Sequence, residues 1–235
     1  METRPIIPGP PAFTSALTKR ETILVLAYLP VHLVVLQFAF GALITNGTLT
    51  QAYANFLYYA VGALYMLAAG FAFLRRDFDP LADRPFLCLR EILRSLLALY
   101  CCNILLAFLF EALPIGAESP NDESIIAVAS QDARLMKAEL IYLTPIVEEM
   151  LFRAGIFGVL RRKSRLAAYA VSAVCFSLCH VAAYAVYEPL YWLFLLQYLP
   201  VSLLLARLYE RCNTIWAPIL YHMTVNALTA GVLLA

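Results

Sequence analysis

Long apolar stretches limit the fold of this chain more than any other feature. A helix needs about 20 consecutive, mostly apolar residues to cross the hydrocarbon core of a bilayer. Seven stretches of the sequence meet this requirement, at residues 21–45, 51–74, 92–115, 138–160, 165–183, 189–208 and 213–234. None of them shows the strict apolar–polar alternation of the strands in a membrane barrel. The sequence therefore predicts an all-α, polytopic membrane helix bundle with about seven transmembrane helices.

The composition supports a membrane protein and argues against a nucleic acid partner. Hydrophobic residues make up 63% of the chain, well above the roughly 45–50% of an ordinary soluble domain. The net charge is only +1, so the chain has no surplus of basic residues for binding nucleic acid. No organelle-targeting segment is evident, and we expect an integral, multi-pass protein of a bacterial or archaeal plasma membrane.

The positions of the basic residues predict how the bundle is oriented. Inner loops of membrane proteins carry an excess of lysine and arginine. Arg134 and Lys137 fall in an outer segment, and Arg153 falls inside a predicted span. With the N-terminus inside, the inner segments hold fourteen of the 17 basic residues: Arg4, Lys19, Arg20, Arg75, Arg76, Arg84, Arg90, Arg94, Arg161, Arg162, Lys163, Arg165, Arg207 and Arg211. This distribution predicts an N-in, C-out topology.

The chain divides into three predicted segments. Residues 1–20 contain four prolines and little pattern, which predicts a flexible N-terminal arm. Residues 21–133 hold the N-terminal transmembrane helices, with an inner-face linker at 75–91 that mixes arginines with apolar residues. An acidic outer loop, "GAESPNDESIIAVASQDAR", separates this half from a second helical unit at residues 134–235.

Polar side chains gather at one depth in the second helical unit. Counting ~1.5 Å per residue from the inner flanks places four of them roughly 16–22 Å into a core ~30 Å thick. These four are Glu148, His180, His222 and Asn226. Glu149 and Arg153 lie beside them, and the spacing of four residues puts this pair on one helix face. Three predicted helices therefore present polar groups at a common level.

A purely structural role explains only part of this set. An ion pair between Glu149 and Arg153 offsets most of the cost of burying both charges. It leaves Glu148 without a partner in its own helix, and an intramembrane carboxylate of this kind indicates a functional site. A proton-coupled transporter would also place carboxylates and imidazoles at mid-membrane. The sequence shows no inverted repeat that would favour such a transporter.

The chemistry available to these groups fits peptide hydrolysis. A carboxylate can act as a general base towards water, an imidazole can hold that water or protonate a leaving amine, and an amide N–H can stabilise an oxyanion. The sequence contains no GxSxG turn, no GxGD aspartate pair and no HExxH zinc helix, which are typical of other proteolytic routes.

Three short motifs resemble those of a known family. The segments "EEMLFR" (148–153), "FSLCH" (176–180) and "HMTVN" (222–226) are similar to the EExxxR, FxxxH and HxxxN motifs of the CPBP intramembrane proteases, also called the Abi family. This family includes the type II CAAX prenyl endopeptidases. The resemblance covers roughly residues 138–230. One departure is that many members have glycine directly after the motif arginine, where this chain has Ala154 followed by Gly155.

The resemblance implies a role for each motif residue. Glu148 would be the general base, His180 would share the activation of water, and His222 with Asn226 would form the oxyanion site. Glu149 and Arg153 would orient these groups. Residues 134–235 would then be the catalytic core of an intramembrane endopeptidase that acts on a membrane-associated protein or peptide.

Two alternatives remain beside this hypothesis. Zinc could be bound by Glu148, His180 and His222, although we favour a mechanism without metal or other cofactor. Zinc needs three well-converged ligands, and Arg153 competes for the carboxylate of Glu149. The chain could also be a catalytically silent family member that binds and regulates a membrane partner. The sequence does not indicate an oligomeric state.

Overall fold

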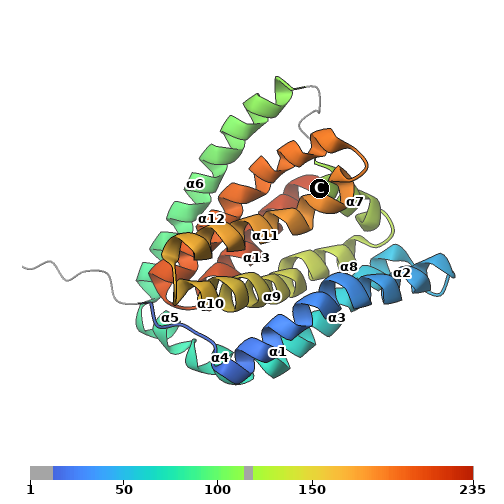
Figure 1. Cartoon of the computed structure of the whole chain (residues 1–235). Helices are drawn as coiled ribbons and strands as arrows, with labels where there is room; N and C mark the ends of the chain where they lie inside the picture. The colour runs from blue at the N-terminus through green and yellow to red at the C-terminus, as the bar shows by residue number, and fades with distance from the viewer. Residues whose placement is uncertain (1–12, 114–118, 235) are drawn as a thin grey trace, which may run out of the picture.

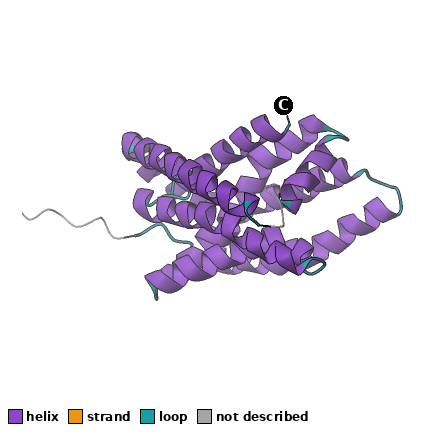
Figure 2. Cartoon of the chain, turned by 90° about the horizontal axis from the view of Figure 1, so that it is seen from above, coloured by secondary structure: helices purple, strands orange, loops and turns teal. Residues whose placement is uncertain are grey.

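The computed structural model describes residues 13–113 and 119–234, and it contains helices and connecting loops but no strand in these ranges (Figure 2). The front half comprises α1 (Lys19–Pro30), the π-helix η1 (Val31–Leu36), α2 (Gln37–Thr45), α3 (Gln51–Ala69), α4 (Phe71–Arg76), α5 (Asp79–Asp83) and α6 (Pro85–Glu111). Because α1, η1 and α2 follow one another without a break, they form a single long helical run. The expected all-α bundle is confirmed.

The second half begins with two short helices, α7 (Pro120–Ala129) and α8 (Ala133–Ala138). From α8 the chain continues as one helical run through η2 (Glu139–Leu143), α9 (Thr144–Glu148), η3 (Glu149–Phe157) and α10 (Gly158–Arg161), in which η2 and η3 are π-helical. The remaining elements are α11 (Arg165–Ala185), the short 3₁₀ helix η4 (Pro189–Phe194), α12 (Leu195–Cys212) and α13 (Trp216–Leu233).

Within the part of the chain that the structure describes, five helical runs are long and apolar enough to cross a membrane, which makes the chain an integral, multi-pass membrane protein. They are Lys19–Thr45, Gln51–Ala69, Pro85–Glu111, Arg165–Ala185 and Pro189–Cys212. The two other predicted spans, 138–160 and 213–234, are also helical, but they contain the polar motif residues and are less apolar. The count of seven spans therefore stays a prediction, although each of the seven predicted segments is mainly helical over its described residues.

The run from α8 to α10 lies between the helices α1 to α3 on one side and α11 to α13 on the other (Figure 1). On one side, α9 and η3 pack against α3 and α1, and on the other side they pack against α13 and α11. Gly155 allows the close approach to α1, because a Cβ atom there would come within 2.9 Å of the Leu26 side chain. The close approach thus occurs at Gly155, one residue after Ala154, which directly follows the motif arginine.

Two details differ from the predicted segments. A flexible arm was expected at residues 1–20. Residues 1–12 of this arm lie outside the described residues, and residues 13–17 are packed against the bundle. Ser15 and Leu17 are buried, and the side-chain oxygen of Asn213 accepts hydrogen bonds from the backbone N–H groups of Thr14 and Ser15. The linker expected at 75–91 ends early, because α6 already begins at Pro85.

The turn before α13 is fixed by residues from the front half of the chain. Asn213 adopts a left-handed conformation, with φ of 54°, and ends α12. The carboxylate of Asp77 accepts a hydrogen bond from the backbone N–H of Ile215 at 2.5 Å, and Thr214 Oγ1 donates to the Asp77 carbonyl at 2.6 Å. These contacts set the start, and hence the position, of the helix that carries the last motif.

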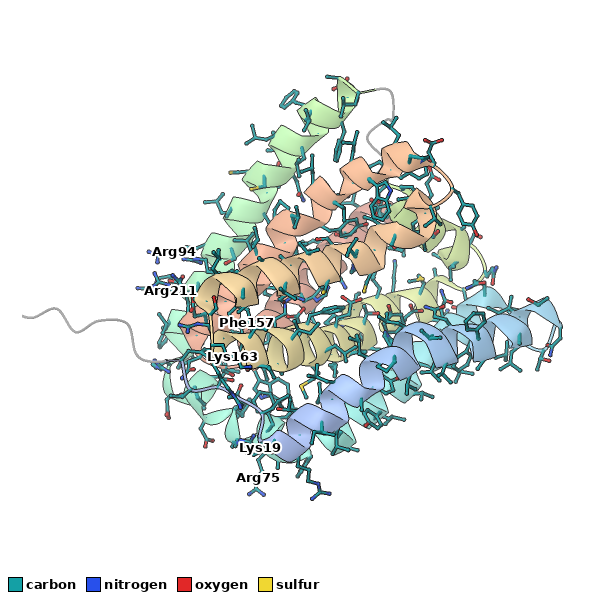
Figure 3. All side chains as sticks on the ribbon, in the orientation of Figure 1. Lys19, Arg75, Arg94, Phe157, Lys163 and Arg211 are labelled. Carbon is teal, nitrogen blue, oxygen red and sulfur yellow. The ribbon has the colours of Figure 1, made fainter. Side chains whose placement is uncertain are left out.

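Basic side chains gather at one end of the bundle. Figure 3 shows Lys19, Arg75, Arg94, Lys163 and Arg211 at this end, whereas the C-terminus lies beside α7 at the other end (Figure 1). A clustering of this kind agrees with the topology that the positive-inside rule predicts. Which side of the membrane each end faces stays a prediction.

Candidate active site

Glu148 lies where the central helical run changes its winding. It is the last residue of α9, and π-helical turns lie on both sides, at Glu139–Leu143 and Glu149–Phe157. Pro145 cannot donate a backbone hydrogen bond, so it favours a local loosening of the helix. π-Turns widen a helix and are common at functional sites. The loosening expected around Pro145 is therefore accompanied by π-helical turns on either side of Glu148.

The Glu148 carboxylate lies between two imidazoles from other helices. Its Oε1 is 3.9 Å from His180 Nε2 on α11, and its Oε2 is 3.9 Å from His222 Nε2 on α13. Both distances exceed that of a direct hydrogen bond. Glu148 and His222 are buried, and Glu148 Oε2 has no hydrogen-bond partner. A water molecule beside these groups would satisfy the carboxylate oxygen.

The Nδ1 atom of each histidine already has a hydrogen-bond partner, and this partner determines the protonation of the Nε2 atom that faces Glu148. His180 Nδ1 lies 2.9 Å from the carbonyl oxygen of Phe176, and His222 Nδ1 lies 2.8 Å from Glu149 Oε1. Both partners are acceptors, so in each neutral ring Nδ1 carries the proton and donates it. The unprotonated Nε2 atoms therefore face Glu148. The Glu148 carboxylate and the two Nε2 atoms are all hydrogen-bond acceptors, and they lie close together. This arrangement favours a ligand that donates hydrogen bonds, such as water.

Glu149 connects the motif helix to α12 and α13. Its Oε1 accepts from Arg153 Nη1 at 3.2 Å as well as from His222, and the side chains of Glu149 and Arg153 are completely buried. Arg153 Nη2 donates to Ser202 Oγ at 2.8 Å and to the Ser202 carbonyl at 3.2 Å. The guanidinium also lies 4.3 Å from the ring centre of Phe176. The i, i+4 ion pair expected from the sequence is present.

Asn226 holds α13 against the first π-turn. Its Nδ2 donates to the Leu140 carbonyl at 2.7 Å. One amide hydrogen is therefore used in packing, and the second remains for a ligand. Asn226 makes no hydrogen bond with Glu148, His180 or His222 among the described residues.

A cavity of about 280 Å³ opens beside these groups. It is lined by His180, His222 and Asn226, whereas Glu148 is not one of the lining residues and its carboxylate adjoins both imidazoles instead. Three of the four side chains that the sequence places at one depth therefore line this cavity. The lining also includes polar residues from α6, α7 and α12: Asn103, Asn121, Asp122, Gln197 and Tyr198.

Sequence reasoning missed the residues that α12 contributes. Tyr198 stacks on His180 with ring centres 4.6 Å apart and an interplanar angle of 27°, and Ser202 binds Arg153. Gln197 lines the cavity, and its Oε1 is buried without a hydrogen-bond partner. The only available signal was the presence of polar side chains in an otherwise apolar span. No motif marks this helix.

The three residues that could bind zinc are spaced more widely than the donors of a tetrahedral zinc site. Two donors on a tetrahedral zinc ion, each ~2.1 Å from the metal, lie about 3.4 Å apart. The carboxylate of Glu148 is 3.9 Å from each imidazole nitrogen. Within residues 13–113 and 119–234, no group of three or more His, Cys, Asp or Glu side chains is arranged to bind a metal ion. We therefore derive no step through a metal, and independence of zinc stays a prediction.

Comparison with known proteins finds similarity over part of the chain. A 113-residue stretch is 34% identical to the "Putative membrane peptidase YdiL" of Bacillus subtilis (strain 168), and it covers 48% of this chain and 42% of that protein. The matched stretch thus spans less than half of this relative. No solved structure matches the chain. Residues 134–228 match the family described as Type II CAAX prenyl endopeptidase Rce1-like. These residues are thus similar to that family, and they contain the three motifs that resemble it.

Proposed function

We propose that this protein is an intramembrane endopeptidase that hydrolyses a peptide bond of a membrane-associated protein or peptide. The observation that carries the proposal is the buried carboxylate of Glu148 between the unprotonated nitrogens of His180 and His222. This arrangement binds and activates water, and it adjoins a cavity that can receive a peptide. The family match and the relative named as a membrane peptidase support the same reaction class.

In the proposed reaction, Glu148 is the general base. A water molecule donates hydrogen bonds to the carboxylate and to His180 Nε2, and Glu148 takes its proton as the oxygen attacks the scissile carbonyl. The proton then passes to the leaving amine as the C–N bond breaks. The balance is one water consumed and one new carboxyl and one new amine formed.

His222 and Asn226 form the proposed oxyanion site. His222 Nε2 donates to the oxyanion while it holds the proton that Glu148 has taken from water, before that proton reaches the leaving amine. The Glu149 carboxylate accepts from its Nδ1 and holds the ring in place. The free hydrogen of Asn226 Nδ2 supplies the second donor. Glu149 and Arg153 act by positioning His222. Glu149 binds the ring of His222, and Arg153, which is bound to Ser202, holds Glu149 in place.

The proposal can be tested by comparing membrane peptides between two cell populations. One produces the wild type and the other produces Glu148→Gln at the same level, and mass spectrometry reads all peptide termini. We expect new termini near membrane segments only with the wild type. Identical terminal peptides in both populations would support a catalytically silent protein instead. Because the family description names CAAX prenyl endopeptidases, prenylated and unmodified peptides should be scored separately.

A further inference from the structure

A cluster of arginines surrounds one buried carboxylate at the basic end of the bundle, where α6 packs on α12. The side chain of Glu91 is only 3% exposed. Its Oε1 lies 2.9 Å from Arg94 Nη1 and 3.6 Å from Arg90 Nε, and its Oε2 accepts from Arg207 Nη2 at 3.0 Å. Three guanidinium groups therefore share one negative charge. We call Arg90, Arg94, Arg207 and Glu91 the Glu91 cluster.

The cluster has unused positive charge and unused hydrogen-bond donors. The side chains of Arg90, Arg94 and Arg207 are 57%, 59% and 37% exposed, so their outer N–H groups are accessible. Each guanidinium has five N–H donors, and Glu91 uses only a fraction of them. Arg211 adds a further charge close enough to act on Glu91, and Figure 3 shows Arg94 and Arg211 at the same end.

Exposed apolar side chains lie directly beside these charges. On α6, Leu93 and Leu97 are 57% and 65% exposed, and on α12 Leu203 is 42% exposed one turn from Arg207. Leu97 and Leu203 lie on the membrane side of the arginines, because α6 begins and α12 ends at this end of the bundle, and Leu93 lies between Arg90 and Arg94. The surface therefore combines the arginines of the Glu91 cluster with three exposed leucines, each within about one helical turn of an arginine.

We propose that the Glu91 cluster binds the phosphate group of an anionic phospholipid, whose acyl chains lie along Leu93, Leu97 and Leu203. The planar fork of arginine matches two phosphate oxygens at once, and three forks held by one carboxylate are already oriented. The excess positive charge favours an anionic lipid over a zwitterionic one. The apolar strip favours a lipid over a soluble phosphate. This site is independent of the proposed protease activity.

The test uses the full-length protein in detergent and counts bound lipid by native mass spectrometry. Phosphatidylglycerol and phosphatidylcholine with identical acyl chains are compared, and a third arm adds inorganic phosphate to the phosphatidylglycerol sample. We expect the wild type to prefer phosphatidylglycerol, with inorganic phosphate leaving the bound lipid in place. Equal binding of the two lipids, or displacement by inorganic phosphate at millimolar concentration, would overturn the proposal.

Variants locate the binding to the cluster. Arg90→Gln keeps both hydrogen bonds of Glu91 and should lower the affinity for phosphatidylglycerol about fivefold. Arg94→Gln combined with Arg207→Gln should lower it further, about fivefold for each arginine. The matched control is Arg75→Gln, an exposed arginine at the same end on α4, which should change the affinity less than about twofold.

Thermal melts in phosphatidylcholine confirm that each variant is folded. If the double variant does not fold, Arg90→Gln decides the question, because it leaves Glu91 paired with Arg94 and Arg207. An equal loss of binding in Arg90→Gln and Arg75→Gln would show that only the overall charge of this end matters, and it would overturn the assignment of a site.

Discussion

Glu149 Oε1 and His222 Nδ1 are joined by a hydrogen bond of 2.8 Å between the central helical run and α13. Because the carboxylate can only accept, this contact fixes which nitrogen of His222 faces Glu148. The same carboxylate oxygen accepts from Arg153. Glu149 therefore sets both the tautomer of one site histidine and the position of the buried arginine.

Glu149→Gln should destabilise the fold as well as lower activity. The substitution leaves Arg153 buried without its charge partner, at a cost of about 3 kcal/mol in the free energy of unfolding. Denaturation of the detergent-purified variant measures this loss. An unchanged unfolding free energy would contradict the structural role that we assign to Glu149.

Ser202→Ala should cost about 1–3 kcal/mol in the free energy of unfolding, because it removes a hydrogen bond to the buried Arg153 guanidinium. Ser177→Ala is the matched control, since the Ser177 hydroxyl is equally buried but has no hydrogen-bond partner. That variant should be nearly neutral. Equal losses in the two variants would show that Ser202 matters only through its volume.

The topology predicts that a reporter fused after Ala235 behaves as external and one fused before residue 1 behaves as internal. The clustering of basic side chains at one end of the bundle, opposite the C-terminus, is the physical reason. Reporter enzymes that work on only one side of the membrane provide the measurement. A cytoplasmic signal from the C-terminal fusion would mean that the number of spans is even.

Treatment with a strong chelator should leave proteolysis by the purified protein intact. The carboxylate of Glu148 and the two imidazole nitrogens are too far apart to share a zinc ion in the described geometry. The measurement is the cleavage rate before and after dialysis against chelator. Activity that disappears and returns with added zinc would favour the zinc-dependent alternative.

The sequence predicts the helices well because membrane thickness sets the length of each apolar run. It places the ends of the helices less well. Pro85 begins α6 inside the predicted linker, since proline is tolerated in the first turn of a helix. The packing of residues 13–17 could not be predicted, because it depends on Asn213, which is 199 residues away from Thr14.

The candidate site was predictable only in part. Counting residues along each helix places Glu148, His180 and His222 at one depth, and the structure brings them together. The hydrogen bond between Glu149 and His222 depends on how far each helix is rotated, and the π-turns alter that rotation. Hydropathy and motif spacing contain no information on this, so the contact of Glu149 with His222 and that of Ser202 with Arg153 came only from the structure.

The central claim is that Glu148 acts as the general base for peptide hydrolysis. Its most direct test is the cleavage rate of a substrate from the membrane-peptide comparison, measured with purified wild type and Glu148→Gln at matched folded concentration. Glutamine keeps the shape of the side chain but cannot take a proton from water. We expect hydrolysis to be lost, while thermal stability and substrate binding are retained. A Glu148→Gln variant that cleaves at the wild-type rate would contradict the account.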